Sequence, residues 1–321
     1  MLSQRRGRGV HSQYMIFPLM VNPFSYSPTV INALERALSP ERLSTYLAAA
    51  NGDHAAALPL YVWNTEISAA LYEEPSIGRV PAWTCTDACY LQAMCGRARL
   101  SSDVSEIKLV FSIPPDRPPP NFPPSWNVAP TDSLPVVRYD RKTEQRSLDL
   151  LRWGLIPYWA KDIKVGFANI NAKAEGIETR PAFRQAFEHR RCLVPVDNFY
   201  EWKKTGTGKQ PYAIALANRG IMALAGLWEN WKSPAGEWVR SFAIVTTEPN
   251  ELCAQLHNRM PVVLAPEAWP AWLGEEPADP AQLKSLLVPY PSGGMVCWPV
   301  STRVGNVKNN DPSLIEPIAA G

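Results

Sequence analysis

The chain has 321 residues, 46% of them apolar, which is enough for one large or two ordinary domains and excludes a disulfide-stapled miniprotein. The 32 Lys and Arg nearly balance the 30 Asp and Glu, so the net charge of +2 excludes a histone-like polycation, and any phosphate-binding surface must be local. No apolar run approaches about 18 residues, so no membrane span is expected.

The first 93 residues differ in composition from the rest of the chain. They contain no lysine, and the one helix predicted there, over Val30–Leu47, carries no recognisable chemistry. Three arginines precede an apolar run in the manner of a signal peptide, but Pro18 interrupts the run and no small-residue cleavage site follows promptly. We expect residues 1–93 to be an N-terminal extension outside the mature domain, and residues 94–321 to form that domain.

The six cysteines lack the paired, even spacing of a secreted disulfide scaffold. Reduced thiols and a cytoplasmic location are therefore expected. Cys85 and Cys89 have no second Cys or His pair at zinc-site spacing, so no metal site is predicted. Glycine patterns typical of nucleotide binding are missing from the sequence, so no cofactor is expected either.

From Met94 onward, apolar runs of strand length alternate with Gly, Pro and Asn turns. Prolines predict an extended surface loop over Ser112–Pro124, and two glycines predict a hairpin turn over Lys203–Gln210. The clearest predicted strands are Leu148–Trp153, Gly220–Leu227, Ser241–Thr246 and Met295–Val300.

Only short helices are predicted, and they do not alternate regularly with the strands. One starts near Pro181 and ends at the basic pair Arg190 and Arg191, which suits the C-terminal end of a helix dipole. The others cover Glu248–Gln255, Pro266–Leu273 and Pro280–Leu287. This pattern favours an α+β fold over a doubly wound parallel sheet.

Four reactive or polar residues stand where packing alone would favour other types: Cys95, Asn171, Glu201 and His257. Glu201 is flanked by Phe199, Tyr200 and Trp202, so desolvation is expected to raise its pKa toward general acid–base use. Each residue also has a structural interpretation: a small buried thiol, a turn-forming amide, a strand-edge carboxylate and a turn-capping imidazole.

Eight short blocks connect these residues. They occur in the order typical of the SRAP family, the SOS response-associated peptidases or abasic-site processing proteins, which this sequence resembles from Met94 to about Pro317. The blocks are Met94–Arg97, Asn127–Pro130, Trp153–Pro157, Asn171–Glu175, Arg191–Pro195, Phe199–Lys203, His257–Pro261 and Val304–Lys308. The resemblance implies a β-rich α+β fold of mixed and antiparallel sheets with a barrel-like core.

The resemblance also implies a protein of the DNA-damage response that binds single-stranded DNA and crosslinks itself to an abasic site. Cys95 matches the family's cysteine that becomes N-terminal after removal of the initiator Met. A ring-opened abasic sugar offers an aldehyde, which the amine of a terminal cysteine attacks to form an imine and the thiol then closes to a thiazolidine. An α-amine, with a pKa of about 8, is neutral far more often at neutral pH than a lysine, with a pKa of about 10.4.

Other roles follow from matching motifs. Glu201 is expected to transfer protons during dehydration and ring closure, His257 to assist sugar opening and any reverse or lyase reaction, and Asn171 to orient Cys95 or the sugar hydroxyl. Five further residues are predicted DNA contacts. Cations would hold phosphates, while Asn127 and Trp159 would contact the backbone and stack on or wedge beside a base. The five are Arg97, Asn127, Trp159, Lys173 and Arg259.

The sequence departs from the family pattern in three places. Lys173 replaces a common arginine, which turns a bidentate phosphate fork into a point charge, and Asn198 replaces a common glycine, whose left-handed backbone angles Asn tolerates. The third departure is the extension before Met94, because it leaves the nitrogen of Cys95 in a peptide bond. Translation from Met94, autoproteolysis at Met94–Cys95, and a retained extension without crosslinking are the three explanations.

Two rival functions remain open at this stage. One is a cysteine peptidase built from Cys95, His257 and Asn171, which leaves Glu201 unexplained. The other is a noncatalytic single-strand binder in which Cys95 is incidental. The expected partner is single-stranded DNA containing abasic sites, and the expected state is a monomer.

Overall fold

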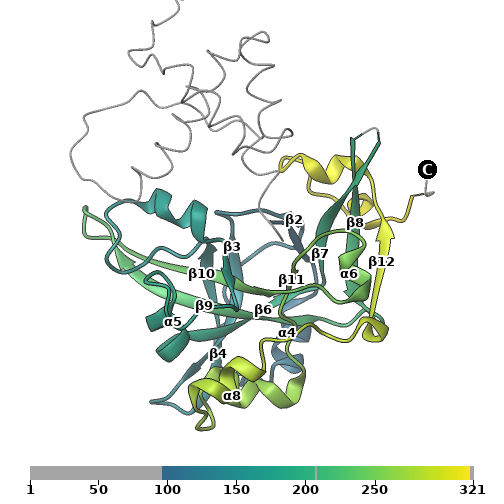
Figure 1. Ribbon diagram of the computed structural model, residues 1–321. Coiled ribbons are helices and arrows are strands. Elements are labelled where there is room, and N and C mark those ends of the chain that lie inside the picture. Colours follow the sequence, from purple (N-terminus) through teal and green to yellow (C-terminus); the bar gives the residue numbers. More distant parts are fainter. Residues whose placement is uncertain (1–95, 207, 319–321) are drawn as a thin grey trace, which may run out of the picture. The chain divides into compact units, whose positions relative to one another are not determined.

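A five-stranded barrel forms the core of the computed structural model, which describes residues 96–206 and 208–318 (Figure 1). Around the ring the order is β10-β4-β3-β6-β9, and β9 pairs with β10 to close it. Only the β10–β4 contact in this ring is parallel. The barrel strands are β3 (Ser133–Asp140), β4 (Gln145–Trp153), β6 (Arg191–Val196), β9 (Met222–Lys232) and β10 (Trp238–Thr247).

Two short strands flank the C-terminal end of β10. β5 (Asn171–Lys173) pairs with it in parallel, and β11 (Met260–Pro261) pairs with it in the antiparallel sense. The end of β10 therefore brings together two segments that are far apart in sequence.

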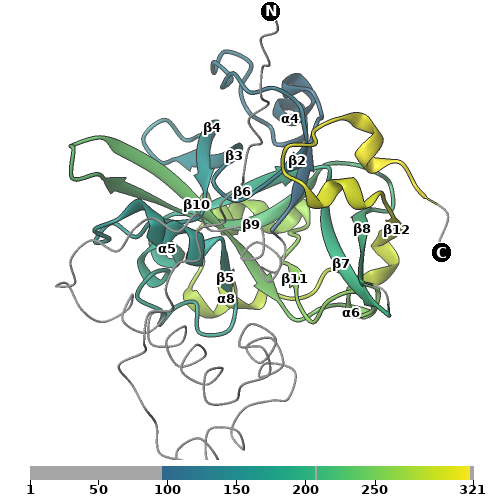
Figure 2. The same ribbon diagram turned by 90° about the horizontal axis from the view of Figure 1, so that it is seen from above.

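A second, antiparallel sheet has the order β12-β8-β7-β1-β2. Side chains alternate across it, so Phe199 belongs to the main hydrophobic core, whereas Tyr200 joins a smaller cluster with Val304 and Leu314. The C-terminal segment containing Val304 and Leu314 lies beside β2 and β8 (Figure 1; Figure 2). The strands are β1 (Ala98–Leu100), β2 (Ser125–Val128), β7 (Asn198–Thr205), β8 (Gly208–Leu216) and β12 (Met295–Pro299).

The helices are short, and in the described part of the chain none is long and apolar enough to cross a membrane. The α-helices are α4 (Val104–Val110), α5 (Arg184–His189), α6 (Glu251–Ala254), α7 (Trp269–Leu273) and α8 (Pro280–Ser285). The 3-10 helices are η2 (Ile163–Asn169), η3 (Pro266–Ala268), η4 (Ser292–Gly294), η5 (Thr302–Gly305) and η6 (Pro312–Ile315).

The α+β class and barrel-like core predicted from the sequence are confirmed. Two of the predicted strands fall within β4 and β10, the other two overlap β9 and β12 and extend one or two residues beyond them, and the predicted hairpin turn joins β7 to β8. Two local expectations need correction. The helix predicted to end at Arg190 and Arg191 ends at His189, and Arg191 opens β6. Asn198 lies in β7 opposite Arg99 and has no positive φ, so no left-handed tolerance is required there.

Candidate functional site

The end of β10 brings two of the predicted catalytic segments together. Asn171 at the start of β5 pairs with Ile244, and Lys173 pairs with Thr246. On the other side Met260, three residues after His257, pairs with Thr247. These pairings place the Asn171 and His257 blocks on either side of one strand end.

His257 has a hydrogen bond that defines its neutral tautomer. Its Nδ1 accepts from the backbone N–H of Arg259 at 3.2 Å, so the ring proton of the neutral imidazole is on Nε2. The His257 backbone N–H donates to the Cys253 carbonyl at 2.9 Å, which anchors the residue to the end of α6. The half-buried ring therefore presents Nε2 as its outward proton donor.

Glu201 is a buried carboxylate on β7, with only 4% of its surface exposed. Its charge contributes, after burial, to raising the pKa of the Cys253 thiol to about 12. The backbone carbonyl of the same Cys253 accepts from the His257 N–H, so both predicted residues are related to this helix.

The burial of Glu201 has a different cause from the one expected. Alternation along β7 puts Glu201 on the face of Phe199, toward the main core, and puts Tyr200 and Trp202 on the opposite face. Only one of its three aromatic neighbours in sequence therefore shares its face.

The described chain begins beside the strand that carries Glu201. Ala98 pairs with Phe199, and the Arg97 carbonyl accepts a hydrogen bond from the Tyr200 N–H at 3.0 Å. One more step in this antiparallel register puts Gly96 opposite Glu201. Cys95, the predicted nucleophile, precedes Gly96 and lies outside the described residues.

Arg97 and Asn127 form a buried polar hub. The Arg97 Nη1 donates to the Asn127 Oδ1 at 2.8 Å and to the Val304 carbonyl at 2.7 Å, and its Nη2 donates to the Gly305 carbonyl at 3.0 Å. The Asn127 Nδ2 donates to three carbonyls, of Val304, Asn306 and Asn309, at 2.9–3.1 Å. These side chains hold the loop 304–309 against the start of the described chain.

Arg259 is also held by protein groups, while Lys173 is exposed. The Arg259 guanidinium makes a two-point ion pair with Glu175, at 2.5 and 2.8 Å, and donates to the Thr246 carbonyl at 2.6 Å. The hydrogen bond from Arg259 is the main reason that the pKa of Glu175 is lowered. Lys173 is thus the predicted cation at this strand end with the most open side chain.

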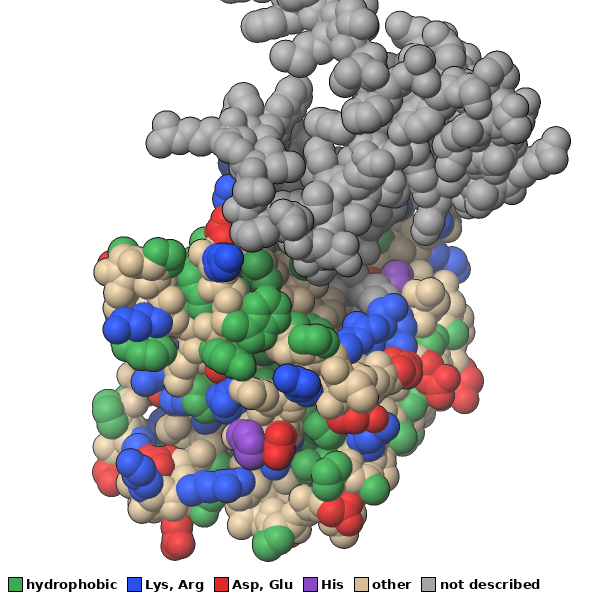
Figure 3. All heavy atoms as spheres, turned by 60° about the vertical axis from the view of Figure 1, so that its left-hand side comes forward, with side chains coloured by type: hydrophobic (Ala, Val, Ile, Leu, Met, Phe, Trp, Pro, Cys, Tyr) green, Lys and Arg blue, Asp and Glu red, His purple; other side chains and the backbone are tan. Residues whose placement is uncertain are grey.

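Trp159 lies in a loop that presents several aromatic and aliphatic side chains to solvent. Its surface is 51% exposed, and Tyr158, Ile163 and Phe167 are exposed nearby in the chain. Figure 3 shows hydrophobic side chains gathered on one face of the molecule with Lys and Arg side chains beside them. Exposed rings next to cations are typical of surfaces on which nucleic-acid bases stack.

Close backbone packing fixes the base of this loop. A Cβ added to Gly166 would lie 2.6 Å from the Gly154 carbonyl oxygen, and Gly154 itself has a φ of +116°. The Leu155 N–H donates to the Asn169 carbonyl at 3.1 Å, and the Asn169 Nδ2 returns a bond to the Leu155 carbonyl at 3.2 Å. The two ends of the loop are therefore joined at a site where only glycine fits.

Comparison with known proteins identifies the family. The model of the SOS response associated peptidase (SRAP) family matches residues 94–307. This chain belongs to the SRAP family. The abasic site processing protein YoqW of Bacillus subtilis (strain 168) is 42% identical over 224 residues, covering 70% of this chain and 99% of its own length. The abasic site processing protein HMCES of Gallus gallus is 30% identical, covering 62% of this chain and 68% of its own length.

The fold comparison agrees with this assignment. A crystal structure of a protein from Bacteroides thetaiotaomicron superimposes with a TM-score of 0.63, covering 70% of this chain and all of that chain, at 24% identity. At this identity the likeness shows a shared fold alone.

Two features of the SRAP site were missed by sequence reasoning. Cys253 accepts the His257 backbone N–H and its thiol is influenced by the charge of Glu201, but nothing in the motifs marked it. The contact of Arg97 and Asn127 with the Val304–Lys308 block was also missed. The three blocks belong to one ordered set of motifs, and this could have suggested that they lie together. The roles of all nine site residues stay predictions, because the geometry records where they lie and not what they do.

Proposed function

We propose that this SRAP protein processes abasic sites, by binding single-stranded DNA and forming a covalent thiazolidine through Cys95 once that residue is N-terminal. The carrying observation is the hydrogen bond from the Tyr200 N–H to the Arg97 carbonyl, which places the chain two residues after Cys95 beside β7, the strand that carries the buried Glu201. The names of the relatives, abasic site processing proteins, support the same substrate class.

The covalent step needs no redox partner. The α-amine of Cys95 adds to the aldehyde carbon of the ring-opened sugar, giving a carbinolamine that loses one water to form an imine. The thiol sulfur then adds to the imine carbon, and its proton passes to the nitrogen. One C–N and one C–S bond form, so the adduct has the mass of protein plus DNA minus one water.

Glu201 and His257 supply the proton transfers in this proposal. A carboxylic acid shielded from water can protonate the departing hydroxyl of the carbinolamine, and the carboxylate that results can accept the thiol proton during ring closure. The His257 Nε2–H faces away from the Arg259 backbone bond and is available to the sugar oxygen during ring opening. The same donor would serve the reverse reaction or a lyase step, and Asn171 would orient the attacking residue or the sugar hydroxyl.

The DNA contacts divide into direct and indirect groups. Lys173 and Trp159 are exposed and would contact a phosphate and a base directly. Arg259 would reach a phosphate from its ion pair with Glu175. Arg97 and Asn127 donate to protein groups in the hub, which favours a role in shaping the binding surface through loop 304–309 over direct phosphate contact.

A denaturing gel with an abasic single-stranded oligonucleotide tests the proposal. The chain starting at Cys95 should give a heat-stable shifted band whose mass shows the loss of one water. The Cys95→Ala variant and the full 321-residue chain with its extension attached should give none. A retained extension together with an equal yield of adduct would show the mechanism to be wrong.

The same samples separate the two rivals. Affinity for the oligonucleotide without any adduct would indicate a passive single-strand binder. Cleavage of peptides without any adduct would indicate a cysteine peptidase using Cys95 and His257. The intact mass of the protein from its own host reports where the mature chain begins, and so separates a retained extension from a chain that starts at Cys95.

A further inference from the structure

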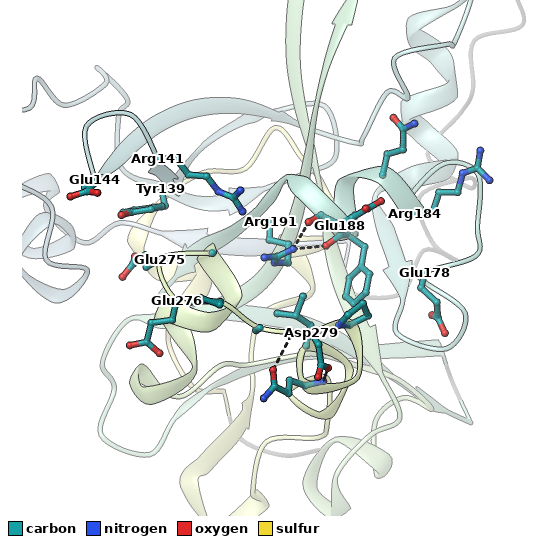
Figure 4. Close-up of a pocket in the computed structure, with 18 residues that line it drawn as sticks. Tyr139, Arg141, Glu144, Glu178, Arg184, Glu188, Arg191, Glu275, Glu276 and Asp279 are labelled. Carbon is teal, nitrogen blue, oxygen red and sulfur yellow. Dashed lines mark hydrogen bonds between the residues drawn. The ribbon is translucent and has the colours of Figure 1, made fainter.

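A broad surface hollow of about 1210 Å³ lies where the end of the β3–β4 hairpin meets α5 and the α7–α8 segment. None of the residues proposed for DNA chemistry lines it. Two arginines, Arg141 and Arg191, extend toward each other in it (Figure 4).

Arg191 is buried with only main-chain acceptors. It is 8% exposed, and its Nε donates to the Trp272 carbonyl at 2.6 Å. Its Nη1 donates to the carbonyls of Phe187 and Glu188 at 2.7 and 2.8 Å. Within residues 96–206 and 208–318, no carboxylate pairs with this guanidinium and no protein acceptor meets its Nη2. The Nη2 is not a fully buried atom, so it stays open to the hollow.

Arg141 adds a second positive charge at the same point. The Nη2 of Arg141 and the Nη2 of Arg191 lie 3.2 and 3.4 Å from the position where a Cβ on Gly274 would stand. Gly274 ends α7 with a φ of +80°, so the lack of a side chain there leaves room between the two guanidinium groups. Burial, and then the charge of Arg141, lower the pKa of Arg191 to about 10, so it still carries its charge at neutral pH.

Acidic residues surround the hollow but do not neutralise this pair. Glu275 is bound at two points by Arg146, Glu178 is paired with Lys284, and the Asp279 side chain caps α8. In Figure 4 the Glu144, Glu275 and Glu276 side chains point away from the two arginines. Such a rim repels an extended polyanion such as DNA but leaves space for one compact anionic group.

We infer that Arg141 and Arg191 bind one compact oxyanion, the phosphate or carboxylate group of a small molecule, in the hollow beside Gly274. A purely structural role, in which Arg191 holds the ends of α5 and α7 together, explains its Nε and Nη1 hydrogen bonds. It does not explain why a second arginine converges on the free Nη2. A bidentate oxyanion would satisfy both guanidinium groups and remove their mutual repulsion.

Calorimetric titration of the domain with inorganic phosphate, and separately with acetate, tests this inference. Saturable binding of either anion, with a dissociation constant in the millimolar range or lower, is expected. The anion that binds shows whether the site takes a phosphate or a carboxylate group. Arg141→Gln should weaken it about tenfold or more, because a charge-assisted contact is lost from an exposed residue that the fold does not need. The matched control is Arg184→Gln, which removes a rim arginine that points away from the pair (Figure 4).

Three results would overturn the inference. They are no saturable binding of either anion, equal losses in the Arg141→Gln and Arg184→Gln variants, and competition by an undamaged single-stranded oligonucleotide, which would make the hollow part of a DNA surface. Arg141→Gln should leave adduct formation with abasic DNA unchanged, so failure of this site and failure of the proposed function are distinguishable.

Discussion

The buried polar hub and the exposed loop around Trp159 both carry residues predicted from the sequence as DNA contacts, yet they differ in what their side chains do. In the hub, Arg97 and Asn127 donate their side-chain hydrogen bonds to backbone carbonyls of the loop 304–309. In the loop, Trp159 is half exposed and free to meet a ligand. The comparison teaches that residue type alone does not separate a binding residue from a structural one, whereas burial and donor satisfaction do.

The hub should respond most strongly to mutation. Asn127→Ala removes donors from three carbonyls and an acceptor from Arg97, so the free energy of unfolding is expected to fall by about 3 kcal/mol. Urea denaturation measures this loss. Lys173→Ala, on an exposed side chain, is the control and should change stability by less than about 0.5 kcal/mol. Equal, small effects of both variants would contradict the distinction between buried structural residues and exposed ones.

The glycine contact at the base of the loop should rank next. Gly166→Ala drives a methyl group into the Gly154 carbonyl, and such overpacking costs about 1–3 kcal/mol. The midpoint temperature of thermal unfolding and the affinity for single-stranded DNA should both fall, because the loop must shift. Gly293→Ala, where nothing lies within 4 Å of the added Cβ, should behave as the parent chain. An unchanged DNA affinity in Gly166→Ala would show that DNA binding does not depend on the shape of this loop.

Trp159→Ala should show the opposite profile from the hub variant. Loss of one stacking ring is expected to weaken single-strand binding by about 1–3 kcal/mol, roughly 5- to 150-fold, with little change in unfolding free energy. Fluorescence anisotropy with a short oligonucleotide measures the affinity. Trp238→Ala removes another exposed tryptophan outside the loop and should bind normally. If both variants bind equally well, the loop is not a base-stacking surface.

The Glu175–Arg259 pair should give the smallest effect. Because the pKa of Glu175 is lowered in the folded state, its stabilisation is present above its usual value of 4.5 and is lost as the pH falls through the lowered pKa. Glu175 is 60% exposed, so the contribution is below about 1 kcal/mol. Glu175→Gln should abolish this part of the pH dependence of unfolding. A variant that keeps the parent's acid profile would contradict the assignment.

Local sequence signals predicted much of the fold. As expected, a helix starts at Pro280, and the glycines at 206 and 208 lie where β7 turns into β8. β6 was not predicted because every residue in Arg191–Val196 is buried, so the sequence has no alternation to reveal a strand. The β6–β9 pairing and the parallel β4–β10 pairing join segments far apart in the sequence, and periodicity does not encode such contacts.

The candidate site was predicted by residue but not by arrangement. The resemblance named Glu201 and His257, yet it did not show that the Cys253 carbonyl accepts the His257 backbone N–H or that the Arg259 N–H donates to the His257 Nδ1. Nor did it show that Arg97 is buried, because a motif records residue types and not solvent exposure. Charge clusters such as Arg141 and Arg191, 50 positions apart, become visible only when the chain is folded.

Because the ribosome synthesises the chain from its N-terminus, the hydrogen bonds of the hub cannot all form at the same time. Arg97 and its acceptor on Val304 are 207 residues apart. At about 5–20 residues per second, roughly 10–40 seconds of elongation separate the two groups. A nascent chain stalled before residue 304 can already pair β1 with β2 and β7, but the Arg97 guanidinium still lacks its carbonyl acceptors on Val304 and Gly305.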